Sequence, residues 1–387
     1  MPHVLSADDL VALIKRVFVP GPMDTALAII VDLPDAAVPD NDAWRARRKM
    51  ASDWAAALQS KKAELGIETD LYVYRNTRAQ NADLPRGAWL HAGHPLPESA
   101  DALDPSAEVP FDVIFGTHRL FMAPTQFSAT APLKLNAKKY LFRAATMPGF
   151  SDGMIPWLKL DYGEIGRRVN LLKQLVDDAV LAEVFFDVDE SDDYRLNIDL
   201  RHRKSHASGG LFPTPGEAGN LPSGETYIVP YEGELPDDPS RTSGDLPVQY
   251  GDEVVVYRVE ANKAVGVEGS GPAAAREREL TSREPAYANI AELGFGVLAD
   301  FGVKPLGDLL SGEKLGPHIA LGRSDHFGGM VGAAQFSRPE AVIHIDHVYI
   351  PEMQPRIRIR SLSFRMPDHN IVPIMRDGQY VIYFRKV

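Results

Sequence analysis

The sequence contains no cysteine, no long apolar run and no excess of basic residues, and each absence removes a class of function. Without cysteine there are no disulfide bonds and no thiolate metal sites, so any metal must be held by histidine, aspartate and glutamate. The formal net charge of -12 argues against a nucleic-acid partner, because phosphates would be repelled. No apolar stretch reaches the roughly 18 residues that span a bilayer, and the N-terminus lacks a signal-peptide pattern. We therefore expect a cytoplasmic protein that binds neither nucleic acid nor membrane.

The hydrophobic pattern divides the 387 residues into two parts of different texture. In the first part, strand-like runs at residues 26–31, 71–74, 111–115 and 139–143 alternate with helix-like stretches at about 42–65 and 162–181. After residue 182, short strands, turns and hairpins predominate. We predict an α/β fold, α+β overall, in which an N-terminal α/β domain at residues 1–183 precedes a β-rich, metal-binding catalytic domain at residues 184–387.

The clearest candidate metal ligands lie in the apolar segment at residues 341–350. The alternation of a β-strand places His344 and Asp346, two residues apart, on the same face. An imidazole and a carboxylate on one face can share a cation. The only basic run, Arg356 to Arg360, also alternates, and it is typical of the solvated face of a strand.

Three further residues of metal-ligand type occur in short apolar or glycine-rich segments. Glu225 follows a turn at the start of an apolar strand, Glu292 precedes a Leu-Gly-Phe-Gly sequence, and His318 lies within Gly-Pro-His-Ile-Ala-Leu-Gly. Each alone has an ordinary structural explanation, such as an exposed strand-start glutamate, a turn or a hydrogen-bonded core histidine. The hypothesis of a metal site therefore depends on the whole set.

That set, in this order, resembles the metallo-aminopeptidase family typified by aminopeptidase T and aminopeptidase S. The matching pieces are Asn-Leu-Pro-Ser-Gly-Glu ending at Glu225, Glu-Leu-Gly-Phe-Gly opening at Glu292, His-Ile-Ala-Leu-Gly opening at His318, and the His-x-Asp strand at His344 and Asp346. A weaker resemblance extends upstream to about residue 138, whereas the N-terminal third matches only in its α/β texture.

The resemblance implies a homodimer that cleaves N-terminal residues from peptides with two divalent cations, of zinc, cobalt or manganese. Three carboxylates and two imidazoles can hold two ions if one carboxylate bridges them. Glu225 is the candidate bridge and Glu292 the candidate ligand or general base, while His318, His344 and Asp346 would complete the ligand set.

One segment departs from the family pattern. Where the family has a tyrosine seven positions after the histidine equivalent to His318, this chain has Asp325, followed by His326. Asp325 is a candidate sixth metal ligand and His326 a candidate catalytic acid/base or substrate-binding group. A turn aspartate that caps the glycine-rich segment explains Asp325 equally well.

Two other functions remain open on the same scaffold. One is a mononuclear iron(II) oxygenase, as in the dihydroxypyridine dioxygenases that resemble these aminopeptidases, with His318, His344 and Asp346 as its two-histidine, one-carboxylate triad. The other is a non-catalytic peptide-binding or accessory protein. The number of bound metal ions separates the two enzymes, and turnover separates both from the accessory protein.

The strand placement of His344 leads to a first prediction. His344→Ala should remove bound metal and abolish any activity without unfolding the chain, because the side chain serves a site rather than a core. Metal content and circular dichroism of the variant test this, and full retention of metal would refute the assignment.

Overall fold

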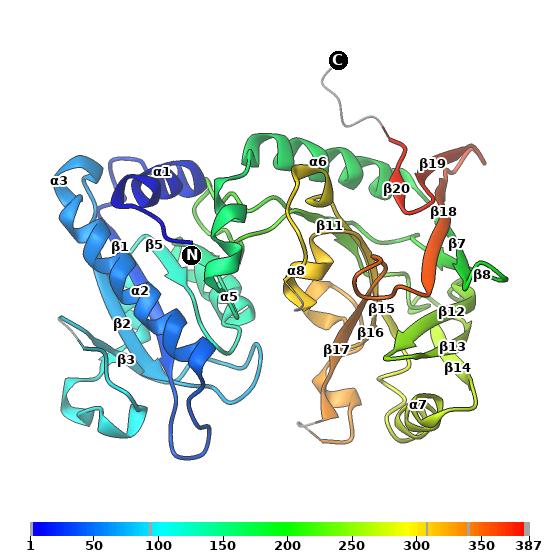
Figure 1. The fold of residues 1–387 in the computed structure, drawn as a ribbon, viewed down its shortest axis with the longest axis horizontal. Coiled ribbons are helices and arrows are strands. Elements are labelled where there is room, and N and C mark those ends of the chain that lie inside the picture. The colour runs from blue at the N-terminus through cyan, green and yellow to red at the C-terminus, as the bar shows by residue number, and fades with distance from the viewer. Residues whose placement is uncertain (1–2, 93–94, 307–308, 339–340, 383–387) are drawn as a thin grey trace. The chain divides into compact units, whose positions relative to one another are not determined.

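The computed structural model describes residues 3–92, 95–306, 309–338 and 341–382 (Figure 1). Its helices and sheets confirm the mixed α/β fold class. Contacts between Cα atoms group the chain into two compact units, Met1–Tyr162 with Gly210–Ser223 and Gly163–Gly209 with Gly224–Val387. This division assigns residues 163–183, which we expected in the first domain, to the second unit, and it returns residues 210–223 to the first.

The first unit alternates strands with helices. Its elements are α1 (Ala7–Phe18), β1 (Ala26–Leu33), α2 (Asp42–Ser60), α3 (Lys62–Leu65), β2 (Glu68–Arg75), β3 (Gly87–Leu90), η1 (Ala100–Ala102), η2 (Pro105–Ala107), β4 (Val109–Pro110), α4 (Phe111–Thr117), β5 (Leu120–Ala123), α5 (Thr130–Tyr140), β6 (Arg143–Thr146), η3 (Asp152–Lys159) and β10 (Ala218–Asn220).

A single sheet in the order β10-β6-β5-β1-β2-β3-β4 organises this unit. The pairs from β10 to β2 are parallel, and β3 adds to β2 in the antiparallel sense. On one face, Ala28 and Ile30 of β1 belong to a core formed with α4 and α5. On the other face α2 packs against β1 and β2. Because both faces are covered, residues 26–31 of β1 are all apolar rather than alternating.

Two predicted strands of this unit are wrong. Residues 111–115 form the start of helix α4, in which Phe111, Ile114 and Phe115 are buried while Val113 is 51% exposed. A strand would have buried Val113 together with the two phenylalanines, whereas the observed burial follows the spacing of a helix. Five apolar residues are too few to distinguish these two periods in the sequence. Residues 139–143 likewise divide between the end of α5 and the start of β6, with Leu141 as a left-handed C-cap.

The second unit is rich in strands, as predicted for the C-terminal part. Its elements are α6 (Tyr162–Asp178), β7 (Leu181–Val188), β8 (Asp192–Asp199), β9 (His206–Ser208), β11 (Glu225–Ile228), β12 (Ser243–Tyr250), β13 (Glu253–Glu260), β14 (Lys263–Glu268), α7 (Pro272–Arg283), β15 (Ile290–Gly296), η4 (Ala299–Phe301), α8 (Leu309–Glu313), β16 (Pro317–Gly322), η5 (Asp325–Phe327), η6 (Ala333–Gln335), β17 (His344–Val348), β18 (Ile357–Arg365), β19 (Ile371–Arg376) and β20 (Gln379–Tyr380).

Two sheets build this unit. The first has the order β17-β16-β15-β11-β9, and the second has the order β14-β13-β12-β8-β7-β18-β19-β20. Phe295 of β15 meets Phe364 of β18 edge to face at 5.6 Å between ring centroids, and both side chains are fully buried. The two sheets therefore share a core on this side of β15, and the opposite face of the five-stranded sheet is left for other side chains.

The basic run on β18 is neutralised by carboxylates of the same unit. Arg358 pairs with Asp187 at 2.7 Å across the β18–β7 ladder, and Arg360 pairs with Asp193 at 2.7 Å. These arginines form ion pairs on a strand face, as the alternation indicated. Among the described residues, no helix has both the length and the apolar character needed to cross a membrane.

The core around β5 gives a test of the first unit and of helix α4. Phe121→Ala should lower the free energy of unfolding by about 3–5 kcal/mol, because Phe121 is fully buried among Phe115 and Phe142. All four tryptophans of the chain lie in this unit, so tryptophan fluorescence during urea unfolding reports on it. As the control, Val113→Ala should change the stability by no more than about 0.5 kcal/mol. A large loss of stability in Val113→Ala would instead support the strand that the sequence pattern predicted at residues 111–115.

Candidate metal centre

Strand register gathers the five predicted ligands on one face of the five-stranded sheet. Across neighbouring strands, Glu225 lies opposite Gly296, and His318 lies opposite Gly294. Ala320 of β16, the strand between β15 and β17, lies opposite Glu292 on one side and Asp346 on the other. Directly opposed residues share a face, and residues two apart on one strand do as well. His344, two residues before Asp346, therefore joins the other four.

Glycines on this face make room for the functional groups. A Cβ atom at Gly294 would lie 1.9 Å from Nε2 of His318, so the imidazole occupies the space that a side chain would take. A Cβ atom at Gly296 would lie 2.3 Å from the carbonyl oxygen of Glu313, so the main chain before β16 passes directly over the strand. The Glu-Leu-Gly-Phe-Gly sequence thus combines one ligand with two close approaches.

A chain of polar contacts connects the five side chains. Nε2 of His318 lies 3.3 Å from Oε1 of Glu292, and Nε2 of His344 lies 3.3 Å from its Oε2. Oδ1 of Asp346 is 3.5 Å from Nε2 of His344, and Oε2 of Glu225 is 3.9 Å from Nε2 of His318. Glu292 thus lies between the two histidines and offers one oxygen to each. Glu225, the predicted bridge between two metal ions, lies on the far side of His318 from Glu292 in this chain of contacts.

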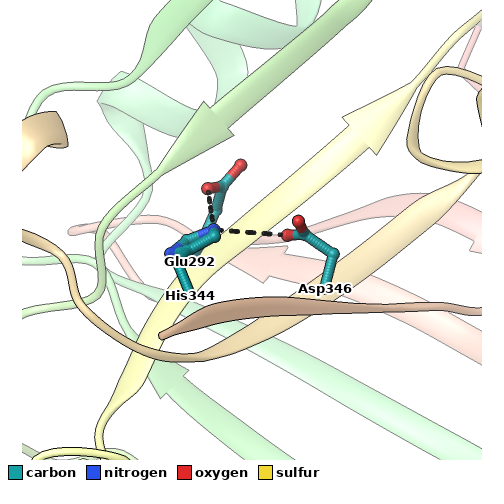
Figure 2. Close-up of side chains that lie close together, drawn as sticks. All are labelled: Glu292, His344 and Asp346. Atoms are coloured by element: carbon teal, nitrogen blue, oxygen red, sulfur yellow. Dashed lines mark ion pairs between the residues drawn. The ribbon is translucent and has the colours of Figure 1, made fainter. Parts of the chain in front are cut away.

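Glu292, His344 and Asp346 form the tightest group. Their ligand atoms all lie within 4.8 Å of one another, a spacing that lets one ion contact all three (Figure 2). Among the described residues, Glu292 is the third member of this group, in the place that the predicted oxygenase triad gave to His318 beside His344 and Asp346. The group therefore contains one imidazole and two carboxylates.

Backbone carbonyl groups orient both histidines. Nδ1 of His344 lies 2.7 Å from the carbonyl oxygen of Arg323, and Nδ1 of His318 lies 3.3 Å from that of Gly316. Since a carbonyl oxygen only accepts hydrogen bonds, each Nδ1 carries a proton, and each Nε2 is the atom that faces the carboxylates. A carbonyl oxygen on the outer nitrogen is the usual arrangement of a metal-binding histidine.

The electrostatics of the centre favour a bound positive charge. Burial alone would lower the pKa of His318, but Glu292 and Asp346 raise it to about 9. The pKa of His344 is likewise raised, against the effect of burial, by the charge of Asp346 and by its contact with Glu292. Conversely, burial would raise the pKa of Glu292, whereas the two histidines hold it below its ordinary value. Without a metal, protons on the imidazoles thus provide the positive charge that the carboxylates require.

The donor set fits a divalent cation by a second observation. Oδ1 of Asp346 is buried and has no hydrogen-bond donor among the described residues. It faces Nε2 of His344 at 3.5 Å, which is longer than an ordinary hydrogen bond. A cation at the Glu292, His344 and Asp346 group would satisfy this oxygen directly. Oxygen and nitrogen ligands of this kind suit zinc, manganese, cobalt or iron.

Lys314 is a member of the cluster that the sequence analysis missed. Its ammonium lies 2.5 Å from Oε1 of Glu225 and also bonds to Glu313, and the side chain is only 1% exposed. These two carboxylates raise the pKa of Lys314 although burial opposes this shift. Burial, together with the charges of Glu225 and Asp346, raises the pKa of Glu313 to about 8. The only sequence signal was a lysine four residues before His318, which is unremarkable by itself.

His326 lies beside the centre, and Asp325 pairs with Arg323 and, at 3.6 Å, with Nδ1 of His326. The ring of His326 meets that of His344 edge to face, with 5.2 Å between centroids. Burial, followed by the charge of His344, lowers the pKa of His326 to about 4. The carboxylate of Asp325 is held by Arg323, with 2.5 Å from Nε to Oδ1. Among the described residues, no ion pair or hydrogen bond joins Asp325 to Glu292.

An aromatic group continues from His326 along the sheet. Phe327 lies 5.5 Å from His344 and 4.9 Å from Tyr227 between ring centroids. Tyr227 stacks on His206 at 5.1 Å. These rings form an apolar border beside the metal-binding group.

A buried glutamate holds the segment that carries His326. Glu232 accepts hydrogen bonds from the hydroxyl of Ser324 at 2.6 Å and from the side-chain amide of Asn289 at 2.8 Å, and it also accepts one from the backbone amide of Met330. Glu232 therefore fixes the loop that carries His326.

Comparison with known proteins identifies relatives of the fold alone. No family model matches the sequence, and no curated protein sequence is significantly similar. Among solved structures, 2,5-dihydroxypyridine dioxygenase from Pseudomonas putida KT2440 matches with a TM-score of 0.60 at 14% identity, over 97% of this chain and 98% of the other. Wild-type AmpT from Thermus thermophilus, an aminopeptidase, matches with a TM-score of 0.54 at 14% identity, over the same shares. The chain therefore has a fold that occurs in two different kinds of enzyme.

The close approach at Gly294 gives a test of the centre. Gly294→Ala should weaken metal binding by roughly 10–100-fold, because the new methyl group displaces the imidazole that contacts Glu292. Isothermal titration with Zn²⁺ measures the change. Gly166→Ala in α6 is the matched control, since a Cβ atom there meets no atom within 4 Å. Equal affinities in the two variants would mean that the position of His318 does not matter for the metal.

Proposed function

We propose that this chain is a metal-dependent hydrolase of the aminopeptidase type, with its metal held by Glu292, His344 and Asp346. The observation that carries the proposal is the largely buried group of two carboxylates and one carbonyl-oriented imidazole, whose ligand atoms lie within 4.8 Å of one another and of which Glu292 is the most buried member. The likeness to AmpT supports the reaction class, because the same fold occurs in that aminopeptidase. The two carboxylates of the group balance the charge of one divalent ion.

The residues around this group suggest how the reaction would proceed. A divalent cation bound there supplies a water of lowered pKa and polarises the scissile carbonyl. His318 holds Glu292 in place through Oε1, so that Oε2 faces His344. The imidazole of His326, beside His344, is the candidate group for exchanging a proton with the substrate.

The border of Tyr227 and Phe327 would limit water and contact the substrate side chain. The positively charged amine of a peptide N-terminus would be attracted by the carboxylates of the centre. An acetylated N-terminus has no such charge. We therefore expect free N-termini to be preferred.

A mononuclear iron(II) oxygenase is the second candidate. It is favoured by the likeness in fold to the dioxygenase and by a group that suits a single ion. Against it stands the composition of the group, which offers one imidazole and two carboxylates instead of the two-histidine, one-carboxylate triad.

The test is reconstitution of metal-stripped protein with Zn²⁺, Co²⁺, Mn²⁺ or Fe²⁺, followed by assays of turnover. Release of p-nitroaniline from aminoacyl-p-nitroanilides, but not from their N-acetylated forms, is expected with at least one metal. Oxygen consumption with Fe²⁺ and dihydroxylated aromatic compounds, without hydrolysis, would favour the oxygenase. Metal binding without either reaction would sink both enzyme proposals and leave an accessory protein.

Glu292→Gln is the variant that links turnover to the centre. It should reduce metal affinity by more than the roughly 10–100-fold that loss of an outer-shell partner costs, and activity should fall with it. The matched control is Glu277→Gln, which alters another buried glutamate, hydrogen-bonded by the hydroxyls of Tyr257 and Tyr287. That control should keep its metal. Loss of metal in both variants would indicate general instability instead of a ligand role for Glu292.

A further inference from the structure

The main chain fixes Lys314 at the Glu225 side of the centre. Gly296, the cross-strand neighbour of Glu225, donates a backbone hydrogen bond to Gly316 at 2.9 Å, and Leu298 donates one to Lys314 at 2.9 Å. Between these two bonds the backbone of residues 313–315 lies directly against Gly296, where a Cβ atom would collide with it. These backbone contacts at and just after strand β15 therefore fix the position of Lys314.

The side chain of Lys314 is almost completely buried. It is 1% exposed, and its ammonium bonds to Glu225 at 2.5 Å and to Glu313. A buried ammonium is stable only with an anionic partner, and removal of that partner is strongly destabilising. Lys314 therefore requires the carboxylate of Glu225, with which it pairs through Oε1.

From this arrangement we propose that the ammonium of Lys314 occupies the place of a second metal ion, so that the centre binds one divalent cation. The inference rests on the metal centre of the proposed function and concerns its stoichiometry. The ammonium of Lys314 thus takes the role that the sequence pattern of five ligands assigned to a second metal ion.

Counting charges supports a single ion. Glu292 and Asp346 supply two negative charges, which one divalent cation balances, and Lys314 balances Glu225. Burial raises the pKa of Glu313, the other partner of Lys314, to about 8, so this carboxyl is mostly protonated near neutral pH. A second divalent ion on the remaining oxygen of Glu225 would lie beside the ammonium on the same carboxylate. Like charges repel strongly where side chains have displaced the water, and these side chains are buried.

The ammonium also acts on the metal-binding group from a distance. Lys314 holds Oε1 of Glu225, whose Oε2 is 3.9 Å from His318, and His318 contacts Glu292 at 3.3 Å. Lys314 is therefore a positioning residue, which acts on the ligand Glu292 through two intermediate side chains.

Metal stoichiometry tests the proposal without any activity assay. Metal-stripped wild-type protein titrated with Zn²⁺ should bind one ion per chain by calorimetry and by elemental analysis after desalting. Lys314→Met, which keeps much of the volume but removes the charge, should gain a second, weaker Zn²⁺ ion at Glu225 and His318. Lys173→Met, at a half-exposed lysine of α6 paired with Asp177, is the matched control and should still bind one ion.

Each other result has a distinct meaning. Two ions in the wild type, or a single ion in Lys314→Met, would overturn the role of Lys314 and leave the proposed hydrolase intact. No ion in the wild type would overturn the metal centre itself. If Lys314→Met fails to fold, paramagnetic resonance of the Mn²⁺-loaded wild type decides, because one ion gives the spectrum of isolated Mn²⁺ and two neighbouring ions give a coupled spectrum.

Discussion

The buried carboxylates on one face of the five-stranded sheet are the constraint on which the rest of the centre depends. Glu225, Glu292 and Asp346 are nearly inaccessible to water, and each needs positive charge close by. Lys314 provides it for Glu225, and the imidazoles provide it for the other two in the absence of metal. A divalent cation bound at Glu292, His344 and Asp346, as proposed, would compete with a proton for Nε2 of His344, so metal binding would release a proton. The sheet supplies the rigid frame that holds these groups near one another.

The surrounding elements can be understood as supports for this charge cluster. Gly294 leaves space for an imidazole, the carbonyl group of Arg323 sets the tautomer of His344, and Glu232 holds the loop that places His326 nearby. The opposite face of the same sheet packs on Phe364 of the eight-stranded sheet. Polar chemistry and hydrophobic packing are thus separated by one layer of backbone, which keeps the ligands on strands rather than on mobile loops.

Local patterns were sufficient to find the residues that the sheet gathers on one face, but not their partners. His344 and Asp346 could be placed on one face because strand alternation is a local property, and the glycines after Glu292 pointed to a close approach. The pairing of Lys314 with Glu225 joins residues 89 positions apart, so no local pattern contains it. The candidate sixth ligand Asp325 pairs with Arg323, two residues before it. The stretch at residues 111–115 failed for another reason, since five residues do not distinguish a strand from a helix.

Strand β17 also sets a limit on how this protein can vary in length. Its site face carries His344 and Asp346, and its reverse face carries Ile345 and the buried His347. An insertion or deletion of one residue within the strand would exchange the two sets, bringing an isoleucine and the wrong imidazole to the carboxylates while sending an aspartate into the core. The same change in the loop before the strand could be absorbed without altering the register. Natural length variation should therefore accumulate between the strands of this sheet and be absent within them.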